Sequence, residues 1–310
     1  MVLDDSFGRP LLNLRVAVTK RCNLNCSFCH GEGEEKCATD FSLLEMKVDE
    51  IVHIVRIAVN LGISRIKLTG GEPLMRKDIA EIVGGISALH GLEDLSMTTN
   101  GTMLAFQARE LYSKGLKRVN INLPTLDPQV YSTLTGSRVT EALDGVEAAV
   151  KAGFSPVKLN MLMLKGINES AVPEMIGFAR RAGVILQLIE LEPINVTGAY
   201  YSVNHKSLDQ YEAMLKEKAS AVETRRRMQN RRIYHLPDVD VETVRPTEST
   251  EFCLHCTRLR LTSDGKLKPC LMRNDNLVDI LAPLQNGASD QELQRLFEIA
   301  NHRRQPYNKN

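Results

Sequence analysis

The chain has 310 residues, and its 39 Lys and Arg side chains nearly balance its 38 Asp and Glu side chains, which leaves a formal net charge of +1. This balance argues against a global field that would attract nucleic acid or an anionic membrane surface, so we expect neither as a partner. No apolar run is long enough to cross a bilayer and the first residues carry no secretory signal pattern, so we expect a cytoplasmic protein.

The cysteines form two groups in the sequence. Seven are too few for a disulfide scaffold in a chain of this length, and clustered thiols in a reducing compartment are typical of metal or redox sites. Cys37 stands alone, and we interpret it as a small half-buried residue without a role in chemistry. The other six form the triplets Cys22, Cys26, Cys29 and Cys253, Cys256, Cys270.

From residue 12 to about 190, one pattern recurs in which a helical stretch ends at a glycine and a short apolar, β-branched run follows. The glycines before successive runs lie 24 to 38 residues apart, which suits one strand, one helix and their loops. Six consecutive βα units predict a parallel sheet, either doubly wound or closed toward a barrel. The predicted strands are 14–19, 65–69, 95–99, 118–122, 157–163 and 185–191.

The helix between the first two predicted strands has recognisable ends. Ser42 with Glu45 three residues later predicts a capping box at its start, and Gly62 ends the helical pattern. Between them an apolar stripe at helical spacing predicts the face that packs on the sheet. The stripe consists of Val48, Ile51, Val52, Val55 and Val59.

Polar residues follow the first three predicted strands, at the edge where ligands of parallel sheets bind. The first cysteine triplet follows strand 14–19, "TGGEP" (69–73) follows the second strand and "TNG" (99–101) the third. The glycine pair lets the backbone approach a ligand and aims the Glu72 carboxylate, which suits an ammonium group. The alternative for "TGGEP" and "TNG" is that they only make turns and helix caps.

Three cations stand inside otherwise apolar strand runs, namely Arg15, Lys67 and Lys158. Buried cations need partners, and a common pocket for a phosphate chain would supply them. The alternative for each is that its head reaches solvent past the strand end. Because three strands share this feature, we favour a common positive pocket.

The first triplet has the spacing Cys22-x3-Cys26-x2-Cys29. Three thiolates hold either a zinc ion with a fourth ligand such as His30, or a four-iron cluster with one iron left open. This spacing, followed by "GGEP", resembles the radical S-adenosylmethionine superfamily. That resemblance implies a full or partial (β/α) barrel.

The second triplet lies in "FCLHCTRLRLTSDGKLKPCL" (252–271). Cys253 and Cys256 form a knuckle, and Cys270 follows a hairpin that we predict to turn at residues 263–266. Arg258 and Arg260 are two residues apart in the first strand of the hairpin and so share a face. The alternative here is a zinc knuckle completed by His255.

Six segments, including "LTGGEPLMRKD", "VNINLPTLDP" and "CTRLRLTSDGKLKPCL", resemble in order the GTP 3',8-cyclase family of molybdenum-cofactor biosynthesis. The resemblance implies an α/β fold with a partial (β/α)6 TIM-like barrel in residues 1–235. Residues 236–310 would be a C-terminal cysteine-containing extension that carries a second cluster. Each triplet would hold one [4Fe-4S] cluster, so that the cofactors are two clusters and S-adenosyl-L-methionine.

The resemblance also implies an activity, that of a radical lyase. Cleavage of S-adenosylmethionine would give a 5'-deoxyadenosyl radical that abstracts the 3' hydrogen of GTP, and ring closure would give 3',8-cyclo-7,8-dihydro-GTP. No catalytic residue beyond the cluster ligands is implied, because the cofactor does the chemistry. The implied partners are GTP, a reductant for the first cluster, the next enzyme of the pathway (cyclic pyranopterin monophosphate synthase) and a second copy in a homodimer.

By the same resemblance, S-adenosylmethionine would contact Phe28, Gly71, Glu72, Asn122 and Glu192. GTP would contact Arg15, Lys67, Thr98, Lys158, Arg258 and Arg260, with Arg65 as a further phosphate ligand. Asn122 replaces an expected serine. Gln187 stands where some members carry an arginine near the triphosphate, so that this contact is either lost or supplied by Arg65 or Arg76. The end "RRQPYNKN" lacks the terminal glycine pair of many relatives.

The basic segment 223–235 is interpreted as a solvated helix face or loop, with a cover over the barrel mouth near the triphosphate as the alternative. Two other functions remain open from the residues. One is a peptide-modifying radical enzyme with an auxiliary cluster, although such enzymes have a more cysteine-rich carboxyl domain. The other is a zinc-binding interaction module without catalytic activity.

Overall fold

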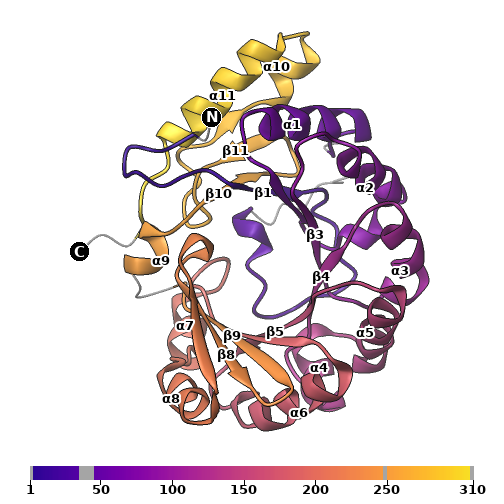
Figure 1. Cartoon of the computed structure of the whole chain (residues 1–310), viewed down its shortest axis with the longest axis vertical. Coiled ribbons are helices and arrows are strands. Elements are labelled where there is room, and N and C mark those ends of the chain that lie inside the picture. The colour runs from indigo at the N-terminus through magenta and orange to yellow at the C-terminus, as the bar shows by residue number, and fades with distance from the viewer. Residues whose placement is uncertain (1–2, 35–44, 247–249, 308–310) are drawn as a thin grey trace.

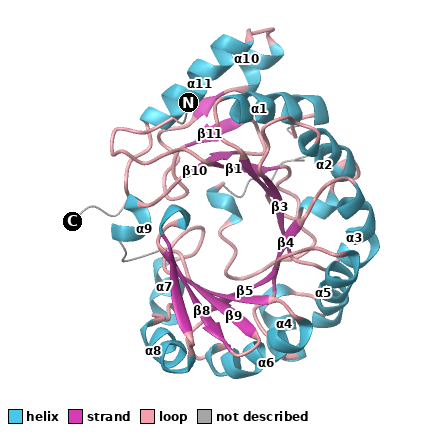
Figure 2. Ribbon diagram, in the orientation of Figure 1, coloured by secondary structure: helices cyan, strands magenta, loops and turns pink. Residues whose placement is uncertain are grey.

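A computed structural model of the chain describes residues 3–34, 45–246 and 250–307. Cys37 and Ser42 lie outside the described residues. The described strands form one twelve-stranded sheet in the order β12-β11-β10-β1-β2-β3-β4-β5-β6-β9-β8-β7. The sheet curves into an incomplete ring with helices on its outer side (Figure 1, Figure 2).

The first half of the chain alternates strands and helices. The elements are β1 Asn13–Ala17, η1 Gly31–Gly33, α1 Val48–Asn60, β2 Arg65–Thr69, η3 Pro73–Met75, α2 Ile79–Ser87, β3 Asp94–Thr99, α3 Leu104–Ser113, β4 Arg118–Asn122, α4 Pro128–Thr135, α5 Val139–Ala152, β5 Val157–Met163, η4 Glu169–Ala171, α6 Val172–Ala182 and β6 Ile185–Glu190.

The second half has shorter elements. They are α7 Gly198–Asn204, α8 Asp209–Lys218, β7 Ala221–Arg225, η5 Arg226–Met228, β8 Arg231–Leu236, β9 Val239–Val244, α9 Thr250–Leu254, β10 Arg258–Leu261, β11 Lys266–Lys268, β12 Val278–Asp279, α10 Leu281–Gln285 and α11 Asp290–His302.

Strands β1 to β6 pair in chain order and are all parallel, which confirms the six predicted βα units. Their observed bounds differ from the predicted runs by at most two residues. The apolar, β-branched composition of these runs suits strands covered on one side by helices. Because β12 and β7 end the strand order without pairing to each other, the barrel is partial.

The C-terminal part extends both edges of the six-stranded core. Strand β10 pairs in parallel with β1, and β11 returns antiparallel to it, which confirms the predicted hairpin around residues 263–266. At the other edge β9 pairs in parallel with β6, and β8 and β7 follow as antiparallel strands. The basic segment 223–235 therefore contributes to the sheet, so its interpretation as a solvated helix face or loop is wrong for these two strands.

Helix α1 begins at Val48, later than the predicted cap implies. At its start the Lys47 N–H donates to the Glu50 carboxylate at 2.7 Å, whereas the Glu45 carboxylate accepts hydrogen bonds from Thr19 and Arg21. The predicted capping box is thus wrong, because Glu45 is used to fasten the segment after β1. The predicted apolar stripe is confirmed, since Ile51, Val55 and Val59 are buried and Val48 and Val52 pack on the same core.

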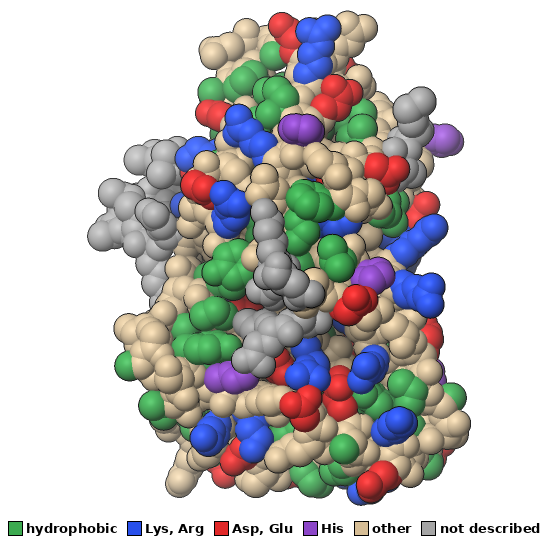
Figure 3. All heavy atoms as spheres, turned by 90° about the vertical axis from the view of Figure 1, so that its left-hand side faces the viewer, with side chains coloured by type: hydrophobic (Ala, Val, Ile, Leu, Met, Phe, Trp, Pro, Cys, Tyr) green, Lys and Arg blue, Asp and Glu red, His purple; other side chains and the backbone are tan. Residues whose placement is uncertain are grey.

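The core is one apolar cluster between the helices and the outer face of the sheet. No helix among the described residues has both the length and the apolarity needed to cross a membrane. The face drawn in Figure 3 shows Lys and Arg side chains interspersed with Asp and Glu, in keeping with the net charge of +1. The strong clustering of charge lies inside the ring instead.

Candidate active site

A pocket of about 630 Å³ lies on the inner side of the sheet and is lined by both cysteine triplets. In β1 and β2 the side chains alternate, so that Arg15 and Lys67 line the pocket while Val16 and Leu68 are buried and do not line it. The prediction that the strand cations share one pocket is confirmed, because Lys158 lines it as well.

The first triplet lies in the segment that follows β1 and crosses the inside of the ring (Figure 1). Its backbone is held by α4, because the N–H groups of Asn25 and Ser27 donate to carbonyls of that helix at 3.1 Å. Phe28 packs on a small apolar cluster of Leu134, Leu164 and Leu191. Residues that are far from this loop in the sequence therefore hold it in place and fix the orientation of its thiols.

Two N–H groups point at the sulfur of Cys22. The Leu24 backbone N–H donates to Cys22 Sγ at 3.5 Å and Asn100 Nδ2 donates to it at 3.9 Å. Burial raises the pKa of this thiol, and these donors act in the opposite direction. Donors to sulfur stabilise a thiolate, so the residues fit a metal-bound cysteine.

The second triplet sits in a cationic environment. Burial alone would raise the pKa of Cys256, but the charges of Arg304 and Arg258 and further neighbours lower it. Gln229 Nε2 donates to Cys256 Sγ at 3.9 Å, and Arg304, which is 1% exposed, donates to the Cys256 carbonyl. Cys253 and Cys270 line the pocket beside it. These features fit thiolates that bind a cluster.

Both histidines weighed as a fourth zinc ligand use Nδ1 for contacts within their own segment. His30 Nδ1 accepts a hydrogen bond from the Glu32 N–H at 3.0 Å, and His255 Nδ1 lies 2.9 Å from the Glu251 carbonyl oxygen. In the part of the chain that the structure describes, no group of three or more Cys, His, Asp or Glu side chains is arranged to hold a single metal ion.

The carboxylate of Glu72 in the "TGGEP" turn takes part in a buried hydrogen-bond network. The Glu72 carboxylate is fully buried and accepts hydrogen bonds from Leu74 N–H at 3.0 Å, Thr99 Oγ1 at 2.7 Å and Asn100 N–H at 2.7 Å. Burial raises its pKa to about 7, against the effect of these donors. Glu72 is not among the residues that line the pocket, and its contact with the ammonium group of a ligand stays a prediction.

Gly71 brings two loops into backbone contact. A Cβ at Gly71 would lie 2.1 Å from the Arg21 carbonyl oxygen, and the Gly71 N–H donates to the Thr19 carbonyl at 2.7 Å. The glycine pair thus seats the turn against the start of the cysteine loop. Gly71 also lines the pocket, as do the other predicted contacts of S-adenosylmethionine, Phe28, Asn122 and Glu192.

All the cations and the threonine predicted for GTP line the pocket, including Arg65. Arg65 also pairs with Glu93 at 3.2 Å near solvent. Arg76, the other candidate for the missing phosphate contact, is buried elsewhere and donates to the carbonyls of Val18 and Met46 at 2.9 Å. The pocket residues are Arg15, Lys67, Thr98, Lys158, Arg258, Arg260 and Arg65.

Among the further charged residues at this group are two arginines of segment 223–235 and two carboxylates that were not singled out in the sequence. Arg225 and Arg231, from the segment interpreted as solvated, line the pocket and lie 3.8 and 3.6 Å from Glu242. Glu242 is fully buried, and Glu32 on the cysteine loop pairs with Arg15 at 2.6 Å. Only the sheet pairing brings these charges together, so no local sequence signal marks them.

A row of amides continues the polar lining across β4, β5 and β6. Asn120 Oδ1 accepts from Lys67 Nζ at 2.9 Å, and Asn160 Nδ2 donates to Asn122 Oδ1 at 2.9 Å. Gln187, the register partner of Asn160, is 3% exposed and lines the pocket. Its Nε2 has no hydrogen-bond partner.

Unsatisfied buried polar atoms concentrate at this pocket. Arg15 Nε, Arg231 Nε, Arg260 Nε and Gln187 Nε2 are buried donors without a hydrogen-bond partner. Burial lowers the pKa of Lys67 well below its usual range, and the charges of Arg15, Arg118, Arg258 and Lys158 lower it further. Buried donors without acceptors are costly, so the arrangement suits a ligand that carries several negative oxygens.

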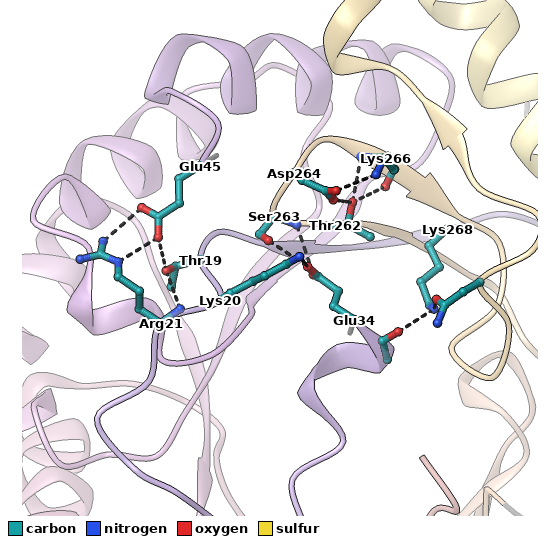
Figure 4. A network of polar contacts seen from close by, with 12 residues as sticks. Thr19, Lys20, Arg21, Glu34, Glu45, Thr262, Ser263, Asp264, Lys266 and Lys268 are labelled. Atoms are coloured by element: carbon teal, nitrogen blue, oxygen red, sulfur yellow. Dashed lines mark hydrogen bonds and ion pairs between the residues drawn. The ribbon is translucent and has the colours of Figure 1, made fainter. Parts of the chain in front are cut away.

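A polar network joins the cysteine loop to the hairpin of the second triplet (Figure 4). The N–H and Oγ of Ser263 donate to the Glu34 carboxylate at 3.2 and 2.8 Å, and Lys20 pairs with Glu34 at 3.4 Å. Lys268 Nζ donates to the Gly33 carbonyl at 3.0 Å. The segment after Cys29 is therefore fixed to the segment before Cys270.

Sequence comparisons divide the chain into two matched regions. Residues 16–179 match the profile of the Radical SAM superfamily, and residues 184–310 match that of Molybdenum Cofactor Synthesis C. A protein from Pyrococcus abyssi named "Probable GTP 3',8-cyclase" is 49% identical over 317 residues, which cover 99% of this chain and 99% of that protein. A protein of the same name from Methanosarcina mazei is 44% identical over 312 residues, which cover 99% of this chain and 90% of that protein.

Solved structures share the fold at low sequence identity. SuiB from Streptococcus suis, bound to S-adenosylmethionine, superposes with a TM-score of 0.64 at 19% identity, over 88% of this chain and 64% of SuiB. The enzyme anSMEcpe with bound AdoMet superposes with a TM-score of 0.60 at 15% identity, over 94% of this chain and 82% of that one. These likenesses confirm the partial-barrel fold class. Together with the matches in sequence, they show that the chain belongs to the radical S-adenosylmethionine superfamily and, within it, to the family of the GTP 3',8-cyclases.

Proposed function

We propose that this protein is a GTP 3',8-cyclase, a radical lyase that catalyses the first step of molybdenum cofactor biosynthesis. Its relatives over the full chain carry that name. The observation in the structure that carries the proposal is the pocket itself, in which unpaired buried donors lie between the two cysteine triplets. GTP carries a polyanionic phosphate chain, which would accept hydrogen bonds from these donors, and a guanine base, which would lie at the second triplet.

The chain's own residues bind and orient the substrate. Arg15, Lys67 and Arg260 lie on adjacent strands at paired positions, so their heads form one side of a phosphate site. Arg225 and Arg231 extend the positive lining, and the ring of strands and the cysteine loop shield the interior from water. When bound, the first cluster and S-adenosylmethionine supply the 5'-deoxyadenosyl radical that abstracts the 3' hydrogen of GTP. Positioning and exclusion of water are the protein's contribution.

Membership of the superfamily supports S-adenosylmethionine and one iron–sulfur cluster as cofactors. We propose that Cys22, Cys26 and Cys29 hold this cluster. We propose a second [4Fe-4S] cluster on Cys253, Cys256 and Cys270. Its support is the lowered pKa of Cys256, the donors around it and the position of all three thiols on the substrate pocket. As contacts of S-adenosylmethionine we propose Phe28, Gly71, Glu72, Asn122 and Glu192.

Several finer points complete the proposal. Residues 1–235 would carry the radical chemistry and residues 236–310 the second cluster with Arg258 and Arg260. The protein would work in the cytoplasm with a reductant for the first cluster, and would pass its product to cyclic pyranopterin monophosphate synthase. A homodimer would be the working form, which analytical ultracentrifugation of the reconstituted protein would test.

The activity test combines reduced, anaerobically reconstituted protein with S-adenosylmethionine and GTP. We expect 5'-deoxyadenosine and 3',8-cyclo-7,8-dihydro-GTP in equal amounts, and 5'-deoxyadenosine only when GTP is present. Formation of 5'-deoxyadenosine without regard to GTP would favour a peptide-modifying enzyme. Zinc without acid-labile sulfide in the anaerobic preparation would favour an interaction module.

A further inference from the structure

Two arginines of the pocket are held side by side by the sheet. Arg15 on β1 and Arg260 on β10 are register partners in a parallel pair, so their side chains leave the sheet on the same face. Two adjacent guanidinium groups repel each other unless an anion lies between them. In the ligand-free protein that anion is the carboxylate of Glu32.

Glu32 reaches both arginines from the cysteine loop. Arg15 Nη2 donates to Glu32 Oε1 at 2.6 Å, Thr69 Oγ1 donates to the same oxygen at 2.6 Å, and Arg260 Nε lies 3.7 Å from Oε2. Burial alone would raise the pKa of Glu32, but the charges of Arg15, His30 and Arg260 keep it below its usual range. The carboxylate is therefore an anion whenever the arginines surround it.

The backbone of Glu32 is strained. Its φ is 53°, between Gly31 at 54° and Gly33 at 71°, so three successive residues adopt the left-handed conformation. A residue with a Cβ rarely adopts this conformation without compensation. Here the compensation is the set of contacts that the carboxylate makes with Arg15, Thr69 and Arg260.

The segment that carries Glu32 is fastened on its far side. Lys268 Nζ donates to the Gly33 carbonyl, and Ser263 donates twice to Glu34, so residues 31–34 are held against the β10–β11 hairpin (Figure 4). Lys268 is 1% exposed. These contacts fix the backbone next to Glu32, so that its side chain starts from a position beside the arginines.

The two arginines keep unused hydrogen-bonding capacity. Arg15 Nε and Arg260 Nε are buried and have no hydrogen-bond partner, although both residues line the pocket. The geometry points to Glu32 as a positioning residue, which holds the Arg15–Arg260 pair from one side and leaves the Arg15 Nε–H group and the other N–H groups of Arg260 for the phosphate chain of GTP. This inference rests on the proposed function. A residue of the first cysteine loop thus organises the triphosphate site.

The test measures dissociation constants of GTP and of guanosine by anaerobic equilibrium dialysis on reconstituted protein. We expect Glu32→Ala to weaken GTP binding about tenfold, the scale of one charged hydrogen bond, and to leave guanosine binding unchanged. Glu32→Gln should restore part of the loss, because the amide oxygen still accepts from Arg15. The double variant with Arg15→Ala should bind GTP as Arg15→Ala alone does, because Glu32 acts through that arginine.

A matched control is Glu212→Ala. Glu212 is also a buried carboxylate between an arginine and a threonine, with Arg232 Nη1 at 3.1 Å and Thr243 Oγ1 at 2.7 Å, but it does not line the pocket. We expect it to leave GTP binding unchanged. Circular dichroism melting checks that each variant is folded, and if Glu32→Ala is not, Glu32→Gln and its double variant carry the test.

Several outcomes would overturn the inference. Additive losses in the double variant would mean that Glu32 does not act through Arg15. An equal loss for guanosine and GTP, or an equal loss in Glu212→Ala, would indicate a general effect on the fold. Unchanged or tighter GTP binding by Glu32→Ala would refute positioning outright. If the unaltered protein bound no GTP, the proposed function itself would fail, which is a distinct result.

Discussion

Lys158 on β5 and Glu242 on β9 form a buried ion pair directly beneath the pocket. The strands are not neighbours, since β6 lies between them in the sheet, and the pair spans it. Arg231 and Arg225 approach the same carboxylate at 3.6 and 3.8 Å. One anion therefore lies among three cations that line the pocket, and this group keeps a positive charge.

The first prediction concerns this pair. Glu242→Gln should lower the free energy of unfolding of the cluster-free protein at pH 7 by about 3 kcal/mol, because it leaves buried cations without a counter-charge. Urea denaturation measures the change. Glu147→Gln removes one partner of an exposed ion pair with Lys151 and should cost less than about 1 kcal/mol. Similar losses in both variants would contradict the importance of burial.

The second prediction is the pH dependence of that loss. Burial alone would raise the pKa of Glu242, but Lys158 and Arg231 lower it from 4.5 to about 2. A carboxyl whose pKa is lower in the folded state stabilises the fold above its unfolded pKa and loses this effect as the pH falls. The stability difference between the protein and Glu242→Gln should thus shrink as the pH falls from about 4.5 toward about 2. A difference that grows with acid would have the wrong sign.

The third prediction separates the two cysteine triplets. The unaltered protein should bind about eight irons after anaerobic reconstitution, and Cys270→Ala about four. Cys22→Ala should abolish cleavage of S-adenosylmethionine, whereas Cys270→Ala should keep the first cluster and lose cyclisation of GTP. Iron and sulfide analysis with product chromatography measures both. Normal cyclisation by Cys270→Ala would refute the second cluster.

The fourth prediction tests the contact between the glycine turn and the cysteine loop. Gly71→Ala would place a Cβ 2.1 Å from the Arg21 carbonyl oxygen, so it should destabilise the protein by about 1–3 kcal/mol and reduce iron loading. Gly198→Ala is the control, because no atom lies within 4 Å of its added Cβ and its φ is ordinary. Thermal unfolding and iron content should change in the first variant alone.

The fifth prediction concerns the unpaired amide of Gln187. Because its Nε2 is a buried donor without a partner on the pocket, we expect it to bind the ligand. Gln187→Leu keeps the size of the side chain and removes the donor, so GTP should bind about three- to tenfold more weakly, the scale of one neutral hydrogen bond. Unchanged affinity in equilibrium dialysis would remove Gln187 from the substrate contacts.

Much of the core could be predicted because its signals are local. The run "RIKLT" between Gly62 and the "TGGEP" turn has one apolar face and ends at a glycine, and β2 occupies the predicted residues 65–69. The charge at Lys67 also revealed the pocket, since a cation within such a run needs an anionic or polar partner. Composition and spacing determine these features without knowledge of the sheet order.

The remaining features depend on contacts between distant residues. Arg231 resembles a solvated charge in "RRIYH" and becomes part of the pocket only because β8 pairs with β9, which carries Glu242. From the sequence alone Glu72 looks like a carboxylate that binds a ligand, and in the structure the end of β3 also brings the Asn100 N–H to it. Glu45 looks like a helix cap and instead binds Arg21. In each case the side chain has a partner that is remote in sequence.

The pairing of β1 with β10 has a consequence for the order of biosynthetic events. Residues 13–17 emerge early from the ribosome, but one edge of this strand stays without its partner until residues 258–261 are synthesised. The arginine pair and the contact between the two cysteine segments therefore cannot form before β10 is made, whatever the speed of the preceding βα units. A protein truncated before β10 would lack the hairpin whose Ser263 and Lys268 hold the segment after the first triplet.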